Sequence, residues 1–144
     1  MNVLKIAAFS DGDTGGNPAG VVIADQLPAE AEMQRIAAEV GFSETAFAAP
    51  VESGWRVRYF APETEVPFCG HATIALGAAL ARQYGNGVFN LRLNQADITV
   101  DGDLLFLSVD APRTDDTCSS EPSNAADPTA WEGMRIFDIS NVRN

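Results

Sequence analysis

The chain has 144 residues, enough for one domain with a substantial hydrophobic core. Hydrophobic residues make up 46% of it and charged residues 20%, which excludes a disordered chain. The net charge of -11 makes nucleic acids and anionic membrane surfaces poor partners, because both are themselves negatively charged.

The sequence predicts a cytoplasmic protein. The N-terminal segment lacks the basic region, long apolar core and cleavage site of a signal peptide, and no apolar run reaches the roughly 20 residues that span a bilayer. The two cysteines, Cys69 and Cys118, show neither a disulfide framework nor metal-ligand spacing. We expect Cys69 to be a free thiol and expect no metal.

The first third of the chain predicts two strands and a helix. Residues 2–9 form a compact apolar run typical of a strand, the turn formers of "SDGDTGGNPAG" predict a loop, and "GVVIAD" predicts a second strand. In residues 27–41 the apolar side chains recur at helical spacing, with a proline near the first turn and a glycine just past the end. This segment is expected to form an amphipathic helix.

The next 70 or so positions predict five more strands and a second helix. A strand pair is expected at "ETAFAAP" and "WRVRYFAP", and three strands at "GVFNLRLN", "ADITVDG" and "DLLFLSVDA". Residues 71–84 are apolar or small around nearly the whole helical circumference, so this helix should be enclosed. The pattern favours an α+β fold, in which a mostly antiparallel sheet of about seven strands carries one exposed and one enclosed helix.

The composition changes after Pro112. Residues 113–144 are rich in Ser, Asp, Pro, Asn and Thr and show little apolar periodicity. We therefore divide the chain into a folded lobe, residues 1–112, and a loosely structured tail, residues 113–144, with a short strand at "RIFDI".

The segment "CGHAT" places the only histidine of the chain at the start of the enclosed helix. Unpaired N–H groups at a helix N-terminus attract anions; Gly70 would let a carboxylate approach, and His71 and Thr73 would add polar contacts. The Cys69 thiol is expected to ionise more readily here than usual, which suits a nucleophile or a base. The alternative is structural: a small core residue, a turn glycine, and a histidine bonded to a nearby carbonyl.

Glu44 and Asn17 are two further candidates. Glu44 lies in "GFSETAF", and an apolar setting disfavours the charged carboxylate and so favours reversible proton transfer near neutral pH. Asn17, held before a proline in "GNPAG", could bind a polar group of a substrate. The alternatives are a solvated turn for Glu44 and an ordinary turn for Asn17. Glu63 and Glu65 are expected to lie in a solvated loop.

Three motifs in this order, "GNPAGVV", "EMQRIAAEVGFSETAF" and "VRYFAPETEVPFCGHATIALGAAL", resemble the N-terminal half of the PhzF-like isomerases of phenazine biosynthesis. The resemblance covers residues 1–112. It implies the diaminopimelate-epimerase-like fold, whose two lobes each wrap an antiparallel barrel-like sheet around a central helix, with the active site between them. It also implies an enzyme without metal or organic cofactor that moves protons on small carboxylate-bearing substrates.

The resemblance also implies roles for individual residues. Glu44 matches the general acid/base glutamate, Gly70 and His71 match the substrate-contacting pair, and Asn17 lies in the matching active-site loop. Related epimerases and racemases carry a catalytic cysteine where Cys69 stands, together with a second cysteine from the other lobe.

The resemblance implies that a full member of this family has a second lobe. We expect this chain to be a truncated copy without that lobe, and to form a homodimer over the face that the lobe normally meets. Three functions stay open. They are a PhzF-like isomerase lobe, a catalytically silent module for small-acid binding or assembly, and a two-base racemase or epimerase that uses Cys69.

Overall fold

A computed structural model describes residues 1–11, 14–101, 104–108 and 134–138. Within these residues nine strands form one sheet, accompanied by two helices. The helices are α1 (Glu30–Val40) and α2 (Gly70–Tyr84). The strands are β1 (Leu4–Asp11), β2 (Thr14–Ile23), β3 (Thr45–Val51), β4 (Gly54–Phe60), β5 (Glu65–Val66), β6 (Val88–Arg92), β7 (Asp97–Asp101), β8 (Leu104–Ser108) and β9 (Met134–Asp138).

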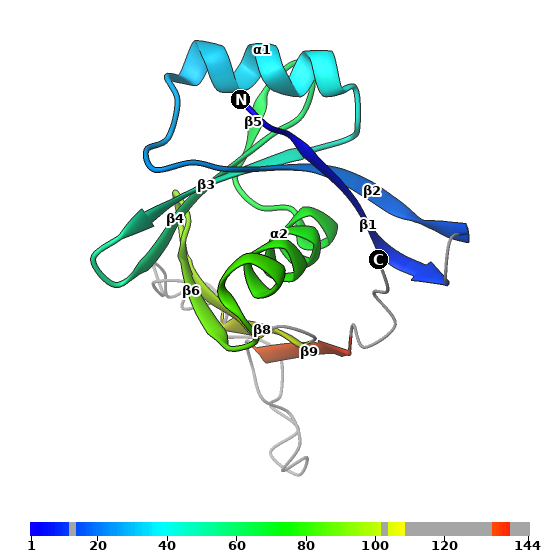
Figure 1. Cartoon of the computed structure of the whole chain (residues 1–144), viewed down its shortest axis with the longest axis vertical. Helices are drawn as coiled ribbons and strands as arrows, with labels where there is room; N and C mark the ends of the chain where they lie inside the picture. The colour runs from blue at the N-terminus through cyan, green and yellow to red at the C-terminus, as the bar shows by residue number, and fades with distance from the viewer. Residues whose placement is uncertain (12–13, 102–103, 109–133, 139–144) are drawn as a thin grey trace, which may run out of the picture.

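The sheet is mostly antiparallel, and its order is β1-β2-β3-β4-β6-β7-β8-β9, with the short β5 paired to β4. Two described pairs run parallel, β2 with β3 and β4 with β6. Parallel neighbours need a long crossover, and here the crossovers contain α1 and α2 respectively. Figure 1 shows the sheet curving around α2, while α1 lies on its outer side. The expected α+β lobe with a central helix is confirmed.

Alternation along the strands explains why the sheet has a helix on each face. Successive strand side chains point to opposite faces. Accordingly Val21, Ala46 and Tyr59 belong to the inner core around α2, whereas their neighbours Val22, Phe47 and Phe60 pack with α1. The outer cluster is completed by the buried face of α1, formed by Met33, Ile36 and Ala37.

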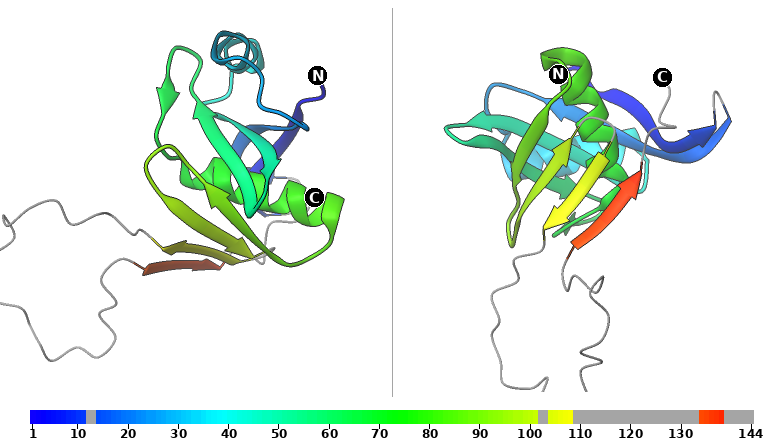
Figure 2. Two further views of the ribbon diagram at one scale, coloured as in Figure 1. Left: turned by 90° about the vertical axis from the view of Figure 1, so that its left-hand side faces the viewer. Right: turned by 90° about the horizontal axis from the view of Figure 1, so that it is seen from below.

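The enclosed helix α2 is buried on most of its circumference from Ala72 to Leu80. Its glycine at position 77 permits a close approach to the sheet, since a Cβ there would stand 2.6 Å from a Val100 side-chain carbon on β7. Packing against the inner face on several sides fixes the axis of α2. Figure 2 shows α2 lying between the early strands of the sheet and the strands from β6 onward. Its first turn is held next to β4, where the hydroxyls of Thr73 and Tyr59 lie 2.6 Å apart.

One prediction for the first third of the chain is wrong. The segment "SDGDTGGNPAG" was expected to be a loop, but β1 continues to Asp11 and β2 begins at Thr14, with Ala8 opposite Asn17 and Ser10 opposite Gly15. Long strand pairing extends through residues whose individual preferences favour turns. Asn17 therefore lies within a strand.

Other differences concern short elements. The two-residue β5 was not predicted, and it gives Glu65 an ordered place instead of the expected solvated loop. Both Glu65 carboxylate oxygens accept bonds from the Arg58 guanidinium on β4, at 2.6 and 2.7 Å. This ion pair holds the pKa of Glu65 below its usual range.

At the end of the chain, the strand expected at "RIFDI" is present as β9, which pairs antiparallel with β8. Most of the predicted tail, including Cys118, lies outside the described residues. The boundary at residue 112 stays a prediction. Neither described helix is long and apolar enough to cross a membrane. The cytoplasmic location also stays a prediction.

Candidate active site

The site is built at the N-terminal end of α2. Cys69 has extended backbone angles and immediately precedes the helix, which begins at Gly70. The carbonyl of Cys69 accepts the Thr73 backbone N–H at 3.0 Å and the Thr73 hydroxyl at 2.7 Å. Because two bonds fix the same carbonyl, the first turn of α2 has a defined position next to the core.

Glu44 reaches this helix end from the connection between α1 and β3. Its carbonyl oxygen accepts the backbone N–H of Gly20 at 3.1 Å, and the next residue, Thr45, is fully buried opposite Gly20 in the β2–β3 pair. The backbone of Glu44 is therefore fixed by the sheet. Its side chain is 22% exposed, so the carboxylate is shielded but open on one side.

His71 joins the two segments. Its Nε2 lies 3.4 Å from a Glu44 carboxylate oxygen and 3.3 Å from the Ser43 hydroxyl, and its Nδ1 lies 3.2 Å from the Cys69 sulfur. The imidazole is 11% exposed. The structure thus brings together the predicted residues Glu44, Cys69 and His71, which we call the Glu44–His71–Cys69 cluster.

The prediction for the acidity of Cys69 is wrong. Burial is the main reason that the pKa of its thiol rises to about 11; the backbone N–H of Ala72 opposes this rise, and the Glu44 carboxylate adds to it. The helix N-terminus does favour a thiolate, but loss of hydration outweighs it. At neutral pH this cysteine carries its proton.

Thr73 supports the helix start from within the core. It is fully buried, and its hydroxyl lies 2.6 Å from that of the equally buried Tyr59. Since the Thr73 proton points to the Cys69 carbonyl, the Tyr59 hydroxyl is the donor of this bond. Burial raises the pKa of Tyr59 well above its usual range. Thr73 has no exposed surface, so in this structure its hydroxyl faces protein groups.

The cluster also contains donor types that bind transition metals. One donor atom from each of Glu44, Cys69 and His71 can be chosen so that all three lie within 4.8 Å of one another. However, the cysteine contacts Nδ1 and the glutamate contacts Nε2. In this structure the two contacts lie at different ring nitrogens, and the Glu44 carboxylate also interacts directly with the Cys69 thiol.

Sequence reasoning missed Ser43 as a member of this site. It precedes Glu44 directly, and its hydroxyl reaches His71 only because the chain returns to this point 28 residues later. No local pattern signals such a contact. Asn17 is exposed on β2, and its role in substrate binding stays a prediction.

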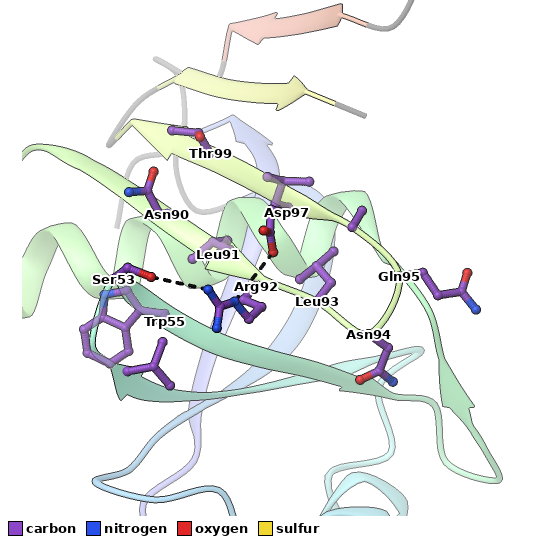
Figure 3. Close-up of a pocket in the computed structure, with 13 residues that line it drawn as sticks. Ser53, Trp55, Asn90, Leu91, Arg92, Leu93, Asn94, Gln95, Asp97 and Thr99 are labelled. Atoms are coloured by element: carbon purple, nitrogen blue, oxygen red, sulfur yellow. Dashed lines mark hydrogen bonds and ion pairs between the residues drawn. The ribbon is translucent and has the colours of Figure 1, made fainter. Parts of the chain in front are cut away.

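A concave region lined by none of the cluster residues lies between the β3–β4 turn and the β6–β7 hairpin. It encloses about 750 Å³ and is lined by polar residues such as Ser53, Asn90, Asn94 and Thr99. Figure 3 shows the Arg92 side chain across this region, 3.4 Å from the Ser53 hydroxyl and 3.9 Å from the Asp97 carboxylate. We call it the hairpin pocket.

Comparison with known proteins places this architecture in a family. The sequence pattern described as "Phenazine biosynthesis-like protein" matches residues 6–130, which is most of the chain. The chain belongs to this family. The match extends to residue 130, beyond the motifs of residues 1–112 that carry the resemblance.

Phenazine biosynthesis-like relatives are similar in sequence and in structure. The chain is 46% identical over 86 residues to "Uncharacterized isomerase YddE" of Escherichia coli K12, covering 59% of this chain and 29% of that protein. It is 32% identical over 117 residues to "Uncharacterized isomerase PA2770" of Pseudomonas aeruginosa PAO1, covering 78% and 45%. A PhzF-family crystal structure from Enterococcus faecalis superimposes with a TM-score of 0.65 at 30% identity, covering 72% and 42%. The chain thus spans less than half the length of each of these proteins.

Proposed function

We propose that this lobe supplies the proton-transferring half of a cofactor-independent isomerase that acts on a small carboxylate-bearing substrate. The observation that carries the proposal is the 3.4 Å approach of the Glu44 carboxylate to His71 at the start of α2. Relatives named isomerases support the reaction class.

In this proposal Glu44 is the general acid/base. Its carboxylate accepts a proton from a substrate carbon, the electron pair stays in the substrate, and the same carboxyl returns the proton to another carbon. A glutamate that is 22% exposed can meet a substrate while most of its surface is shielded from water. The amide groups at the start of α2 and the His71 ring hold the substrate carboxylate.

A racemase based on Cys69 has less support. A base at this position has to be a thiolate, whereas the pKa of about 11 keeps the thiol protonated near neutral pH. The catalytically silent binding module differs from the isomerase in chemistry only, and an exchange experiment separates the two.

The experiment is incorporation of solvent deuterium into a panel of small amino acids and hydroxy acids. We expect exchange with wild-type protein, a loss of exchange in Glu44→Gln, and retention in Cys69→Ser. The reverse pattern for the two variants would establish the racemase. Binding of an acid without any exchange would establish the silent module.

We also propose that the lobe forms a homodimer over the face that carries the site. Phe68 supports this, because it directly precedes Cys69 and its side chain is 40% exposed beside the cluster. Light scattering coupled to gel filtration is expected to show a dimer that Phe68→Ser weakens. A stable wild-type monomer at high concentration would overturn the proposal.

A further inference from the structure

The Cys69 thiol and the Glu44 carboxylate lie at the two different nitrogens of one imidazole. A neutral histidine carries one proton, on either Nδ1 or Nε2, and the hydrogen bond at one nitrogen decides what the other can do. Cys69 sulfur stands 3.2 Å from Nδ1, and Glu44 stands 3.4 Å from Nε2. Both contacts therefore influence which of the two ring nitrogens carries the single proton.

We propose that Cys69 is a positioning residue that donates its S–H to Nδ1 of His71 and so holds the ring in the tautomer whose Nε2–H faces Glu44 and Ser43. The proposal deepens the proposed function, and rests on it in taking Glu44 as the proton carrier. The proposal assigns the ring proton of neutral His71 to Nε2.

The opposite tautomer fits the same atoms less well. With the proton on Nδ1, the unshared electron pair of Nε2 would face the Glu44 carboxylate at 3.4 Å, and the two would repel each other. The ring would also donate to sulfur, which is a weak acceptor. With the proton on Nε2, the Ser43 oxygen accepts it at 3.3 Å and the carboxylate is attracted. The thiol, which also interacts with the Glu44 carboxylate, then has an unprotonated Nδ1 at 3.2 Å as an acceptor.

Burial supports this assignment. Cys69 is 8% exposed and its pKa is about 11, so the thiol retains the proton that it has to donate. His71 is shielded as well, with 11% of its side chain exposed, so water competes little for either nitrogen. The consequence for catalysis is an N–H that orients the Glu44 carboxylate before substrate arrives.

Nitrogen NMR of the ¹⁵N-labelled full chain tests the proposal, since the single histidine removes any ambiguity of assignment. In the wild type, at a pH where the ring is neutral, we expect a protonated Nε2 and an unprotonated Nδ1. In Cys69→Ala the ratio of the Nε2–H to the Nδ1–H tautomer should fall about tenfold, which corresponds to the free energy of about one hydrogen bond. Cys69→Ser retains a donor and should restore the ratio, and Thr99→Val in the hairpin pocket is a control that should not change it.

A protonated Nδ1 in the wild type would overturn the proposal without any variant. So would an unchanged tautomer ratio in a Cys69→Ala protein whose amide spectrum shows a preserved fold. This readout is independent of activity. If the wild-type protein showed the expected tautomer but no deuterium exchange, the proposed function would be contradicted and the tautomer assignment would stand.

Discussion

The Glu44–His71–Cys69 cluster and the hairpin pocket are two polar regions of one small lobe, and they differ in almost every physical respect. The pocket encloses about 750 Å³, and its charged pair, Arg92 and Asp97, is largely solvated, with side chains 58% and 76% exposed. The cluster is small, and its side chains are 22% exposed or less. Shielding from water favours proton-transfer chemistry more than a large volume does. Water screens the interactions between charges and keeps side-chain pKa values close to their ordinary values.

The two regions also differ in how they are held. The cluster is attached to the enclosed helix and to the β2–β3 pair, both of which contribute to the main core. The hairpin pocket is lined by the β3–β4 turn and the β6–β7 pair; Leu91 and Ile98 of this pair belong to the same core, while the polar side chains Asn94 and Asp97 are exposed. A catalytic group has to keep its position to within a fraction of an ångström, and the side chains of Glu44 and His71 are more shielded than those of Arg92 and Asp97.

The largest effect that separates the cluster from a solvated region concerns the reactivity of Cys69. Its pKa of about 11 stands two units above the ordinary value of 9.0, so at pH 7 to 8 alkylation should be about a hundredfold slower than for an unperturbed thiol. The rate should rise about tenfold per pH unit up to the pKa. Iodoacetamide labelling in a Cys118→Ser background measures it.

The same shift predicts the pH dependence of stability. The folded thiol has the higher pKa, so the unfolded chain loses its proton first, and the free energy of unfolding should fall as pH rises from about 9 to 11. Urea titrations of wild type and Cys69→Ala provide the comparison. If the alkylation rate of Cys69 in the folded protein reached half of its maximum below pH 9, the thiol would not have a raised pKa, and the account would be contradicted.

The next largest effect concerns the support beneath the cluster. Thr73→Val removes the hydroxyl between Tyr59 and the Cys69 carbonyl and leaves the buried Tyr59 hydroxyl without its partner. The expected loss is about 2 kcal/mol of unfolding free energy, measured by urea unfolding. In the Thr73→Val background, Tyr59→Phe should lower the unfolding free energy by less than it does in the wild type, because its hydrogen-bond partner is already gone.

Thr99→Val, which makes the same chemical change in the hairpin pocket, is the matched control and should cost under about 0.5 kcal/mol. Equal losses at positions 73 and 99 would remove the distinction between the two regions.

A smaller effect tests the binding of a carboxylate at the helix start. A Cβ at Gly70 would meet only a Phe68 ring carbon at 4.0 Å, so Gly70→Ala should fold with unchanged stability. A substrate that approaches the backbone there would meet the new methyl group, and its affinity should fall about tenfold. Titration calorimetry with an acid found in the exchange screen measures the change, and an unchanged affinity would place the carboxylate elsewhere.

The smallest expected effect lies in the hairpin pocket. Asp97→Asn removes an exposed ion pair of 3.9 Å and should change the unfolding free energy by less than about 0.5 kcal/mol. Deuterium exchange should stay at the wild-type rate. A variant in this pocket that abolished exchange, with the fold intact, would move the active site there.

The comparison also shows what a sequence can reveal. Both helices follow from the spacing of apolar residues, and the motif "CGHAT" was correctly placed at the start of the enclosed one. The extension of β1 and β2 through turn-forming residues was not predictable, because strand pairing overrides individual preference.

Three features of individual side chains depended on tertiary structure. Ser43 reaches His71 and Glu65 reaches Arg58 only after folding has brought separate segments together. The direction of the Cys69 pKa was mispredicted for a related reason. A helix N-terminus is visible in the sequence, but the burial that outweighs it is not.

The central claim is that Glu44 at the start of α2 transfers the proton. The most direct measurement is the rate of solvent-deuterium incorporation into the best substrate of the exchange screen, for wild type, Glu44→Gln and Arg92→Gln in parallel. We expect Glu44→Gln to fold, to bind the substrate with little change, and to exchange about 10²- to 10⁴-fold more slowly, while Arg92→Gln retains the wild-type rate. Wild-type exchange in Glu44→Gln would contradict the account.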